Sequence, residues 1–276
     1  MIELDLGPYH LTVATKYGPR ISGLRLGDGP ELFAALGPEV AIAHAGGTYR
    51  FHGGHRLWAA PEVAEVTYAS DDHECAVVEE QGTITVSAPA DGAGLAKEIE
   101  VSARDDELVV SHRLTTSGPP VSAAAWAITQ FPIGGSVIVP LTGDDTSPLP
   151  NRRLGLWPYT SLSDPRLELR DHSMVVVAAD GAPWKVGTGS ASRRLGYLRQ
   201  GHLFTKEVER VDDHRVPDFG SALQVYVGQG FCELESMGML RRLAEEGSAT
   251  HEERWRVVEC DDLETAHRVV VDGAES

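Results

Sequence analysis

Polar and apolar residues alternate along most of this chain, and this period of two constrains the fold more than any other feature. Such alternation is typical of a β-strand with one face in a core and the other in water. It runs through five stretches: HLTVATKYG, AEVTYAS, ECAVVEEQGTITVSA, AKEIEVSARDDELVVSHRLTTSG and HEERWRVVEC. Helical patterns are confined to short pieces, at 240–246 and 263–269. The sequence therefore predicts an all-β protein.

Tight turns separate the expected strands. Gln81-Gly82 interrupts the alternation in EEQGTITV, and a second turn is expected in ARDDELVV. The chain also contains 29 glycines and 16 prolines, spread evenly rather than gathered in one segment. Many strands joined by tight turns favour one large antiparallel β sandwich.

No segment has the composition of a linker, so we expect residues 1–276 to form a single domain. The loosest stretch is 140–166, which is rich in proline, serine and aspartate. Loops of this length in a compact domain are usually functional or disordered. Because this one carries Trp157 and Tyr159, we expect it to fold back and pack.

The composition limits the partners. With 276 residues and 42% hydrophobic side chains, the chain can bury a core without disulfides or metal. A net charge of −17 argues against nucleic acid or an anionic membrane as a partner bound through a broad basic surface. The three cysteines lack zinc-site spacing, and we predict no cofactor and no metal ion. Neither a signal-peptide pattern nor a membrane-spanning apolar run is found, which indicates a cytoplasmic location.

The segment FHGGHRLWAAPE, at 51–62, gathers two histidines, an arginine and a tryptophan around a Gly-Gly pair. Glycines allow a sharp turn and a close approach of the backbone to a ligand, so His52, His55 and Arg56 are candidate binding residues. Trp58 is expected in the core or in the wall of a pocket. The alternative is a polar turn in which His52 only caps the backbone.

A second candidate is the segment CELES, at 232–236. Residues two apart in a strand share a face, so Glu233 and Glu235 should point the same way. Two neighbouring carboxylates raise each other's pKa, which suits one of them for acid or base catalysis. They could equally share a divalent cation or lie on a solvated face. The apolar residues on either side favour a recessed face.

Several stretches, in their order along the chain, resemble the galactose mutarotase-like superfamily. They are TKYGPRISGLRLGDGPELFA, YRFHGGHRLWAAPE and GFCELESMGMLRRLAEEGSATHEERWRV. Between them, AAAWAITQFPIGGSVIVPL and WKVGTGSASRRLGYLRQGHLFTKEVE resemble a mutarotase-like branch more than the true aldose 1-epimerases. The resemblance covers most of the chain. It implies a large antiparallel β super-sandwich of the galactose mutarotase-like type.

The resemblance also implies an acid/base reaction on a small-molecule substrate, a sugar. Aldose 1-epimerases interconvert anomers by removing the proton of the anomeric hydroxyl and protonating the ring oxygen. The family's base is a glutamate on the late strand, which Glu235 matches, with Glu233 beside it. The family's sugar-holding histidine is matched by His52, and Trp58 could offer its face to the sugar ring.

The chain departs from the family at the second histidine, the general acid of the true epimerases. The corresponding stretch reads SAAAWAITQF and contains no histidine, with Trp126 in that place. Lys185, Lys206 or His55 could supply the proton instead, because burial can lower a lysine pKa to a useful value. Lys185 is the catalytic candidate of the three, and Lys206, Trp126 and Gln130 are candidate substrate-binding residues.

Three functions remain open. The first is an aldose 1-epimerase-like isomerase that acts on a sugar or sugar-like hemiacetal. The second is a non-catalytic carbohydrate-binding protein, which the missing histidine favours and the many ionisable residues oppose. The third is a lyase, cyclase or epimerase of a non-sugar metabolite on the same scaffold, with Glu235 as base and Lys185 or Arg56 as cation.

Overall fold

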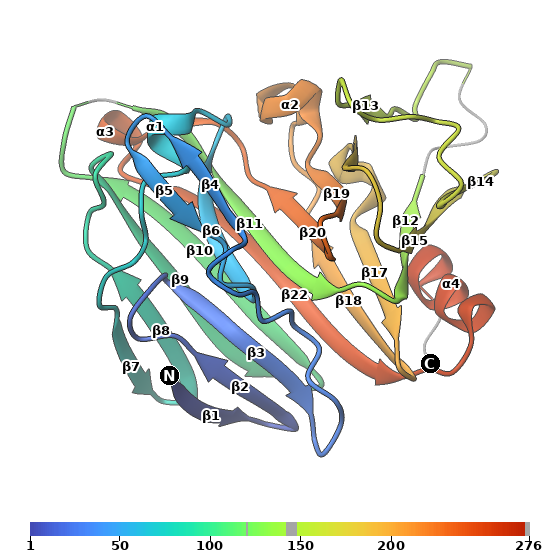
Figure 1. The fold of residues 1–276 in the computed structure, drawn as a ribbon, viewed down its shortest axis with the longest axis horizontal. Coiled ribbons are helices and arrows are strands. Elements are labelled where there is room, and N and C mark those ends of the chain that lie inside the picture. The colour runs from blue at the N-terminus through green and yellow to red at the C-terminus, as the bar shows by residue number, and fades with distance from the viewer. Residues whose placement is uncertain (120, 142–147, 274–276) are drawn as a thin grey trace.

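Two large antiparallel sheets dominate the computed structural model, which describes residues 1–119, 121–141 and 148–273 (Figure 1). Each sheet has ten strands, and their inner faces share one hydrophobic core. A two-stranded sheet and short helices complete the described part of the chain. The predicted all-β, antiparallel sandwich is therefore confirmed.

The first sheet has the spatial order β1-β2-β3-β6-β11-β20-β19-β16-β13, with β21 paired to β11. Its strands are β1 Ile2–Leu6, β2 Tyr9–Val13, β3 Arg20–Leu26, β6 His55–Ala60, β11 Ser122–Pro132, β13 Gly155–Leu156, β16 Trp184–Thr188, β19 Leu223–Gly228, β20 Phe231–Met237 and β21 Arg241–Arg242. At its centre, β11 pairs with β6 on one side and with β20 on the other. Segments from the two halves of the chain thus form one continuous surface.

The second sheet has the order β14-β15-β12-β17-β18-β22-β10-β9-β8-β7. Its strands are β7 Ala76–Glu80, β8 Thr83–Ala88, β9 Leu95–Arg104, β10 Glu107–Thr116, β12 Gly135–Pro140, β14 Leu167–Arg170, β15 Ser173–Ala178, β17 Arg194–Arg199, β18 His202–Val208 and β22 Ala249–Glu259. The separate hairpin consists of β4 Ala41–His44 and β5 Gly47–Arg50. The helices are α1 Ala64–Thr67, α2 Pro217–Gly220, α3 Leu243–Glu246 and α4 Leu263–Asp272, with the 3-10 turns η1 Ser190–Ser192 and η2 Asp213–Arg215.

The predicted turns form for a clear local reason. Gln81 and Gly82 connect β7 to β8 with φ of 51° and 77°, the backbone of a two-residue hairpin turn. Asp105 connects β9 to β10 with φ of 55°. Aspartate tolerates this left-handed conformation better than most residues. These short connections fix the register of β7 with β8 and of β9 with β10.

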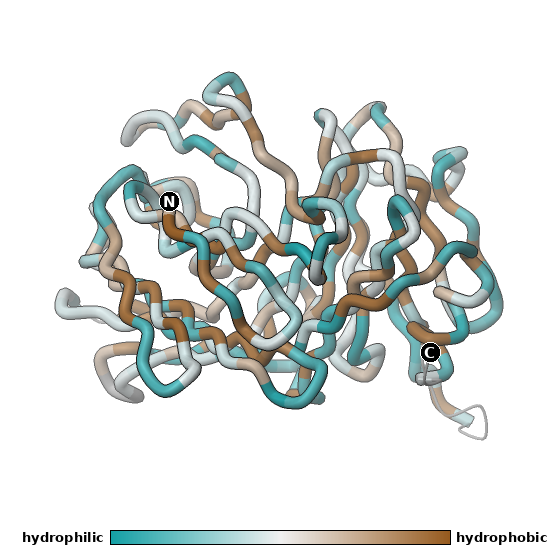
Figure 2. Tube along the Cα trace, turned by 90° about the horizontal axis from the view of Figure 1, so that it is seen from below, coloured by the Kyte–Doolittle hydropathy of each residue, from teal (hydrophilic) through white to brown (hydrophobic). Residues whose placement is uncertain are grey.

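The alternation of the sequence becomes the two faces of each sheet. On β20, Cys232 and Leu234 belong to the core between the sheets, whereas Glu233 and Glu235 point to the outer face. Figure 2 shows hydrophobic positions concentrated along the strands and hydrophilic positions in many of the turns. One step along a strand therefore moves a side chain from the core to the opposite surface.

One expected strand is a helical turn instead. The segment AEVTYAS, at 64–70, was predicted as a strand, but Ala64–Thr67 forms α1. The hydroxyl of Thr67 donates to the carbonyl of Ala59 and accepts from the amide of Val63, which closes the turn against β6. The alternation of this segment is too short to distinguish the two conformations, and the local hydrogen bonds decide.

The two predicted short helical pieces do form helices, α3 and α4. Asp262 caps α4 by accepting from the amide of Thr265 at 2.9 Å, and Gly273 follows its last turn in the left-handed conformation. The apolar face of α4 packs on β12 and β17, outside the second sheet (Figure 1). Among the described residues, no helix combines the length and apolar character needed to cross a bilayer.

The outer face of the first sheet carries a second, smaller apolar cluster. Tyr49 and Phe51, from the β4–β5 hairpin and the residue after it, pack there against Trp58 and Trp126. Because this cluster covers the outer face of the first sheet, strands β6, β11 and β20 are buried on both faces. Polar side chains in that layer are consequently enclosed rather than solvated.

Candidate active site

Five neighbouring strands, β6, β11, β20, β19 and β16, hold most of the predicted site residues on the outer face of the first sheet. Gln130 pairs with Glu233, Glu233 with Tyr226, and Tyr226 with Lys185. Residues directly opposite in antiparallel strands point to the same face. The register therefore places these four side chains in one row across the sheet.

Glu235 lies two residues farther along β20 and is fully buried. Its Oε2 accepts a hydrogen bond of 2.8 Å from Lys185 Nζ and one of 2.9 Å from Trp126 Nε1. Its Oε1 has no partner among the described residues. Burial raises the pKa of Glu235 to about 7; Glu233 adds to the rise, and the Lys185 ammonium opposes it.

Glu233 has a different set of partners. Its Oε1 accepts from Arg56 Nη2 and from Gln130 Nε2, both at 2.9 Å. The Arg56 guanidinium lies 4.1 Å from the centre of the Trp58 ring, so it is held between a carboxylate and an aromatic face. Two carboxylates on one strand thus have distinct environments, one with an arginine and the other with a lysine.

A cavity of about 230 Å³ opens onto this row. It is lined by Ala41, Ile42, Phe51, Trp58, Glu62, Tyr68, Trp126, Tyr159, Lys185, Tyr226, Gln229, Phe231 and Glu233. More than half of these residues are aromatic. The volume is below the ~300–1,000 Å³ of pockets for drug-sized ligands, so the cavity fits a smaller molecule.

Glu233 and Lys185 line this cavity, whereas Glu235 does not. Lys185 and Trp126 contact Glu235 directly and lie between it and the open space. The Lys185 ammonium is 4.8 Å from the ring centres of both Trp126 and Trp157. Glu233 and Lys185 therefore border the space that a ligand would occupy, and Glu235 lies behind them.

Some cavity residues were not predicted as site residues. Tyr68 donates a short hydrogen bond to Glu62 at the rim, and both line the cavity. Tyr226 and Tyr159 line it as well; burial, with a smaller contribution from Glu235, raises the pKa of Tyr159. Tyr226 could have been found from its register opposite Glu233. The others come from loops and a helical turn, whose position no periodicity reveals.

The loop at 140–166 was expected to fold back and pack. Its residues 142–147 lie outside the described part of the chain. In the remainder, Trp157 lies beside Lys185 and Tyr159 lines the cavity. The described part of the loop thus packs over the edge of the first sheet, next to the site.

His52 lies outside the cavity. Its ring stacks on Tyr17 with centroids 4.0 Å apart, and its Nε2 is 2.7 Å from Asp72 Oδ1. His52, Gly53 and Gly54 all have positive φ, of 57°, 86° and 70°. The structure therefore supports the polar turn for His52, while the turn aims the following strand, β6, at the site.

The glycines in that turn are required by close backbone contacts. A Cβ on Gly53 would lie 1.9 Å from the carbonyl oxygen of Ala34, and one on Gly54 would lie 2.4 Å from that of Ile21. The amide of Gly54 donates to the Ala34 carbonyl at 2.9 Å. The Gly-Gly pair thus fits the chain against its neighbours rather than against a ligand.

His55 and Lys206 lie on the other side of the first sheet, between the two sheets. His55 Nε2 is 2.7 Å from His112 Nε2, and Lys206 Nζ pairs with Glu253 Oε1 at 2.8 Å. Lys206 also donates to the carbonyl of Leu234 at 3.0 Å, from behind β20. Both side chains are fully buried there and do not reach the cavity.

The structure therefore brings seven of the ten predicted site residues together and separates three from them. The seven are Glu235, Glu233, Lys185, Arg56, Trp58, Trp126 and Gln130. His52, His55 and Lys206 lie elsewhere. Among the described residues, two groups could offer metal ligands, His55–His112–Glu253 and His52–Asp71–Asp72, and neither contains a residue that lines the cavity beside Glu233 and Lys185.

The fold has counterparts among solved structures. A candidate aldose 1-epimerase from Escherichia coli K12 superposes with a TM-score of 0.54 at 14% identity, over 93% of this chain and 98% of the other. A galactose mutarotase-like protein from Lactobacillus casei gives 0.55 at 11% identity, over 93% and 99%. A galactose mutarotase related enzyme from Lactobacillus acidophilus gives 0.51 at 8% identity, over 95% and 99%.

No protein-family model matches the sequence, and no curated protein matches it either. At 8–14% identity, the structural likeness bears on the fold and not on the reaction. It extends over nearly the whole of this chain and of those three proteins. This chain therefore has the galactose mutarotase-like fold.

Proposed function

We propose that the protein is an aldose 1-epimerase-like isomerase that interconverts the anomers of a free sugar or sugar-like hemiacetal. The observation that carries this proposal is the presence of Glu233 and Lys185 in one small cavity, with Glu235 hydrogen-bonded to Lys185. A carboxylate and an ammonium group in one cavity provide an acceptor and a donor of protons.

The reaction needs both groups close together because the two reacting oxygens are bonded to the same carbon. Glu233 takes the proton of the anomeric hydroxyl while Lys185 gives a proton to the ring oxygen. The bond from the anomeric carbon to the ring oxygen breaks and a carbonyl forms. After rotation about the neighbouring C–C bond, the ring closes on the other face, Lys185 recovers its proton and Glu233 returns the other.

Glu235 has a supporting part in this scheme. The sequence favoured it as the base, but its burial behind Lys185 favours Glu233 for direct contact with the substrate. The hydrogen bond from Lys185 Nζ to Glu235 Oε2 holds the amine of Lys185 in place beside the cavity. The unpartnered Oε1 of Glu235 can also accept a proton that Lys185 passes back.

The aromatic lining supports a carbohydrate as the substrate. Sugar rings present C–H faces that pack on aromatic rings and hydroxyl groups that need hydrogen-bond partners. The rings of Trp58, Trp126 and Tyr226 supply such faces, and Glu62 and Gln229 add polar atoms at the same cavity.

A second candidate is a carbohydrate-binding protein without catalysis. It is favoured by the absence of histidine among the residues that line the cavity in the described part of the chain. An imidazole titrates near neutral pH and is the commonest general acid. Turnover separates this candidate from the isomerase.

The test is anomer interconversion of glucose and galactose, measured by NMR exchange spectroscopy. Wild type is compared with Glu233→Gln, Lys185→Met and the exposed control Glu79→Gln. We expect wild type and the control to accelerate exchange, and the two site variants to lose about 10²- to 10⁴-fold. Sugar binding without acceleration in wild type would instead support the binding protein, and neither binding nor acceleration would overturn both.

A further inference from the structure

A buried polar network lies between the two sheets, behind the strand that carries Glu233 and Glu235. It connects side chains of β6, β10, β11, β18, β20 and β22, which are His55, His112, Thr129, Lys206, Ser236, His251, Glu253 and Trp255. The proposed reaction uses none of them. Interiors of sandwiches are normally apolar, so this concentration of titratable groups needs an explanation.

The two histidines at its centre face each other through their Nε2 atoms. His112 Nδ1 lies 3.0 Å from the carbonyl oxygen of His251, which can only accept, so this nitrogen carries a proton. In the neutral ring, with the proton on Nδ1, His112 Nε2 carries a lone pair directed at His55 Nε2, 2.7 Å away.

His55 can present a lone pair at the same place. Its Nδ1 is 2.8 Å from the hydroxyl of Thr129, which can donate or accept. In one tautomer Nε2–H donates to His112. In the other, Nδ1–H donates to Thr129 and Nε2 is a second lone pair aimed at the same point. Imidazole ligands of metal ions are held in this way, with the far nitrogen bonded to a carbonyl or hydroxyl oxygen.

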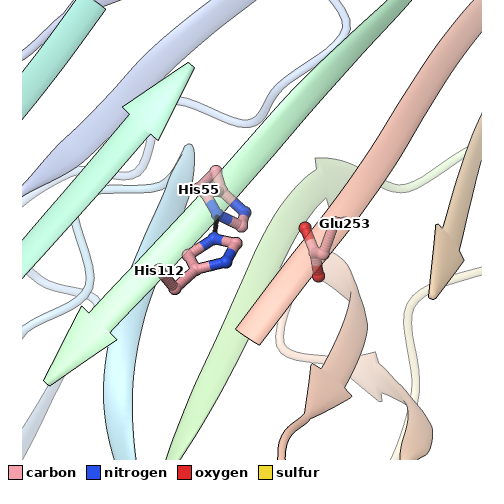
Figure 3. Close-up of side chains that lie close together, drawn as sticks. All are labelled: His55, His112 and Glu253. Carbon is pink, nitrogen blue, oxygen red and sulfur yellow. Dashed lines mark hydrogen bonds between the residues drawn. The ribbon is translucent and has the colours of Figure 1, made fainter. Parts of the chain in front are cut away.

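Glu253 supplies a third ligand atom. One carboxylate oxygen of Glu253 and one nitrogen of each of His55 and His112 lie within 4.8 Å of one another (Figure 3). All three residues are at least 99% buried, and they come from three different strands. Two imidazoles and a carboxylate form a ligand set that suits zinc, cobalt or nickel.

The geometry needs only a small adjustment. Nitrogen ligands at about 2.0–2.1 Å from a tetrahedral zinc ion lie about 3.4 Å apart, so the two rings must separate by less than ~1 Å. Tautomer exchange at His55 frees its Nε2 without any net change in protons. A fourth position would be open to water or to Ser236, whose hydroxyl contacts Glu253.

A cavity borders this cluster at the second sheet. A cavity of about 410 Å³ is lined by His112 and His251 and also by four carboxylate residues, Glu98, Glu100, Glu209 and Glu252. Negative walls raise the local concentration of cations. Arg113 and Arg241 also line this cavity, but the carboxylates outnumber them.

One group opposes a cation. The Lys206 ammonium pairs with Glu253 Oε1 at 2.8 Å and is fully buried. Its charge weakens the attraction of Glu253 for a metal ion. This opposition makes a distinctive prediction, because replacing Lys206 by an uncharged residue should strengthen metal binding, whereas a general loss of folding would weaken it.

We propose that His55, His112 and Glu253 form a binding site for one divalent transition-metal ion of the zinc type. The site is separate from the proposed active site, lying on the opposite face of the first sheet. It stands whether or not the protein is an isomerase. Its three ligands lie at positions 55, 112 and 253, too far apart in the sequence to form a recognisable spacing motif.

The test is metal binding by chelator-treated protein. Co²⁺ is followed by its visible absorption, Zn²⁺ by titration calorimetry, and stoichiometry by elemental analysis. The variants are His112→Gln, Glu253→Gln and Lys206→Met, with His52→Ala as the matched control in the other histidine–carboxylate group. Circular dichroism checks that each variant is folded.

We expect wild type and His52→Ala to bind one equivalent. His112→Gln and Glu253→Gln should weaken binding roughly tenfold or more, and Lys206→Met should tighten it severalfold. No saturable binding by wild type would overturn the proposal, as would unchanged affinity in folded His112→Gln. If His112→Gln fails to fold, weaker binding by Lys206→Met than by wild type would also overturn it.

Discussion

Lys185 on β16 and Glu235 on β20 form a 2.8 Å hydrogen bond although β19 lies between their strands. The lysine side chain is long enough to cross that strand diagonally. Both partners are buried, and Trp126 donates to the same carboxylate oxygen. The lysine at the cavity is therefore held by a carboxylate that does not reach the cavity itself.

The pH dependence of epimerase activity should follow Glu235. Its pKa in the folded protein is about 7, and its ionised form accepts the hydrogen bond that holds Lys185 at the cavity. Because the ionised fraction grows as pH rises, kcat/KM should increase through about pH 7. In Glu235→Gln that inflection should be absent and the maximum lower. A rate profile with the same inflection in Glu235→Gln would assign it to another group.

The substitution Trp126→Phe should shift the pH profile of kcat/KM to higher pH. The indole N–H stabilises the ionised form of Glu235, so its removal raises the carboxyl pKa while the aromatic wall remains. The inflection of kcat/KM should move to higher pH with little change at its plateau. Trp184→Phe is the control, because its indole N–H donates to Ser161 and not to the site. An equal shift in the control would refute this role of Trp126.

Arg56→Met should destabilise the protein. Arg56 is 1% exposed, and its loss leaves Glu233 with a buried charge whose guanidinium partner is missing. We expect the free energy of unfolding to fall by about 3–5 kcal/mol, measured by urea denaturation. The matched control is Arg113→Met, from an exposed pair with Glu98 at 3.6 Å. That change should cost about 0–1 kcal/mol, and equal effects would contradict the argument.

Gly53→Ala and Gly82→Ala separate backbone strain from steric conflict. Both glycines have positive φ, of 86° and 77°. A Cβ at Gly82 meets nothing within 4 Å, so we expect a loss of about 1–2 kcal/mol. A Cβ at Gly53 would overlap the Ala34 carbonyl, so the loss in thermal or urea unfolding should be about 3 kcal/mol or more. Similar losses at both positions would show that the backbone can shift at Gly53.

The sheet architecture could be predicted because alternation is a local signal. Strands β8 and β9 follow it closely, and the turns that connect β7 to β8 and β9 to β10 contain residues with positive φ. The same rule placed Glu233 and Glu235 on one face of β20. It failed at 64–70, where side-chain hydrogen bonds of Thr67 stabilise a helical turn.

The composition of the site was only partly predictable. His55 and Arg56 are neighbours in the sequence, and strand geometry sends them to opposite faces, one into the sandwich and one to the site. The sequence alone predicts that side chains alternate between the two faces of a sheet, but not which face borders the cavity. The contribution of Tyr159 depends on how a long loop packs, and that of Glu253 on pairing between distant strands.

Successive side chains of β20 alternate between two environments. Leu234 faces the core, while Glu233 and Glu235 face the outer layer. Insertion or deletion of one residue here would exchange the two faces and bury both carboxylates in the sandwich. Point substitutions in β20 can be absorbed one at a time, but a change of length cannot. A deletion in β20 would therefore remove the candidate site, whereas a longer turn at Gln81-Gly82 would disturb only the pairing of β7 with β8.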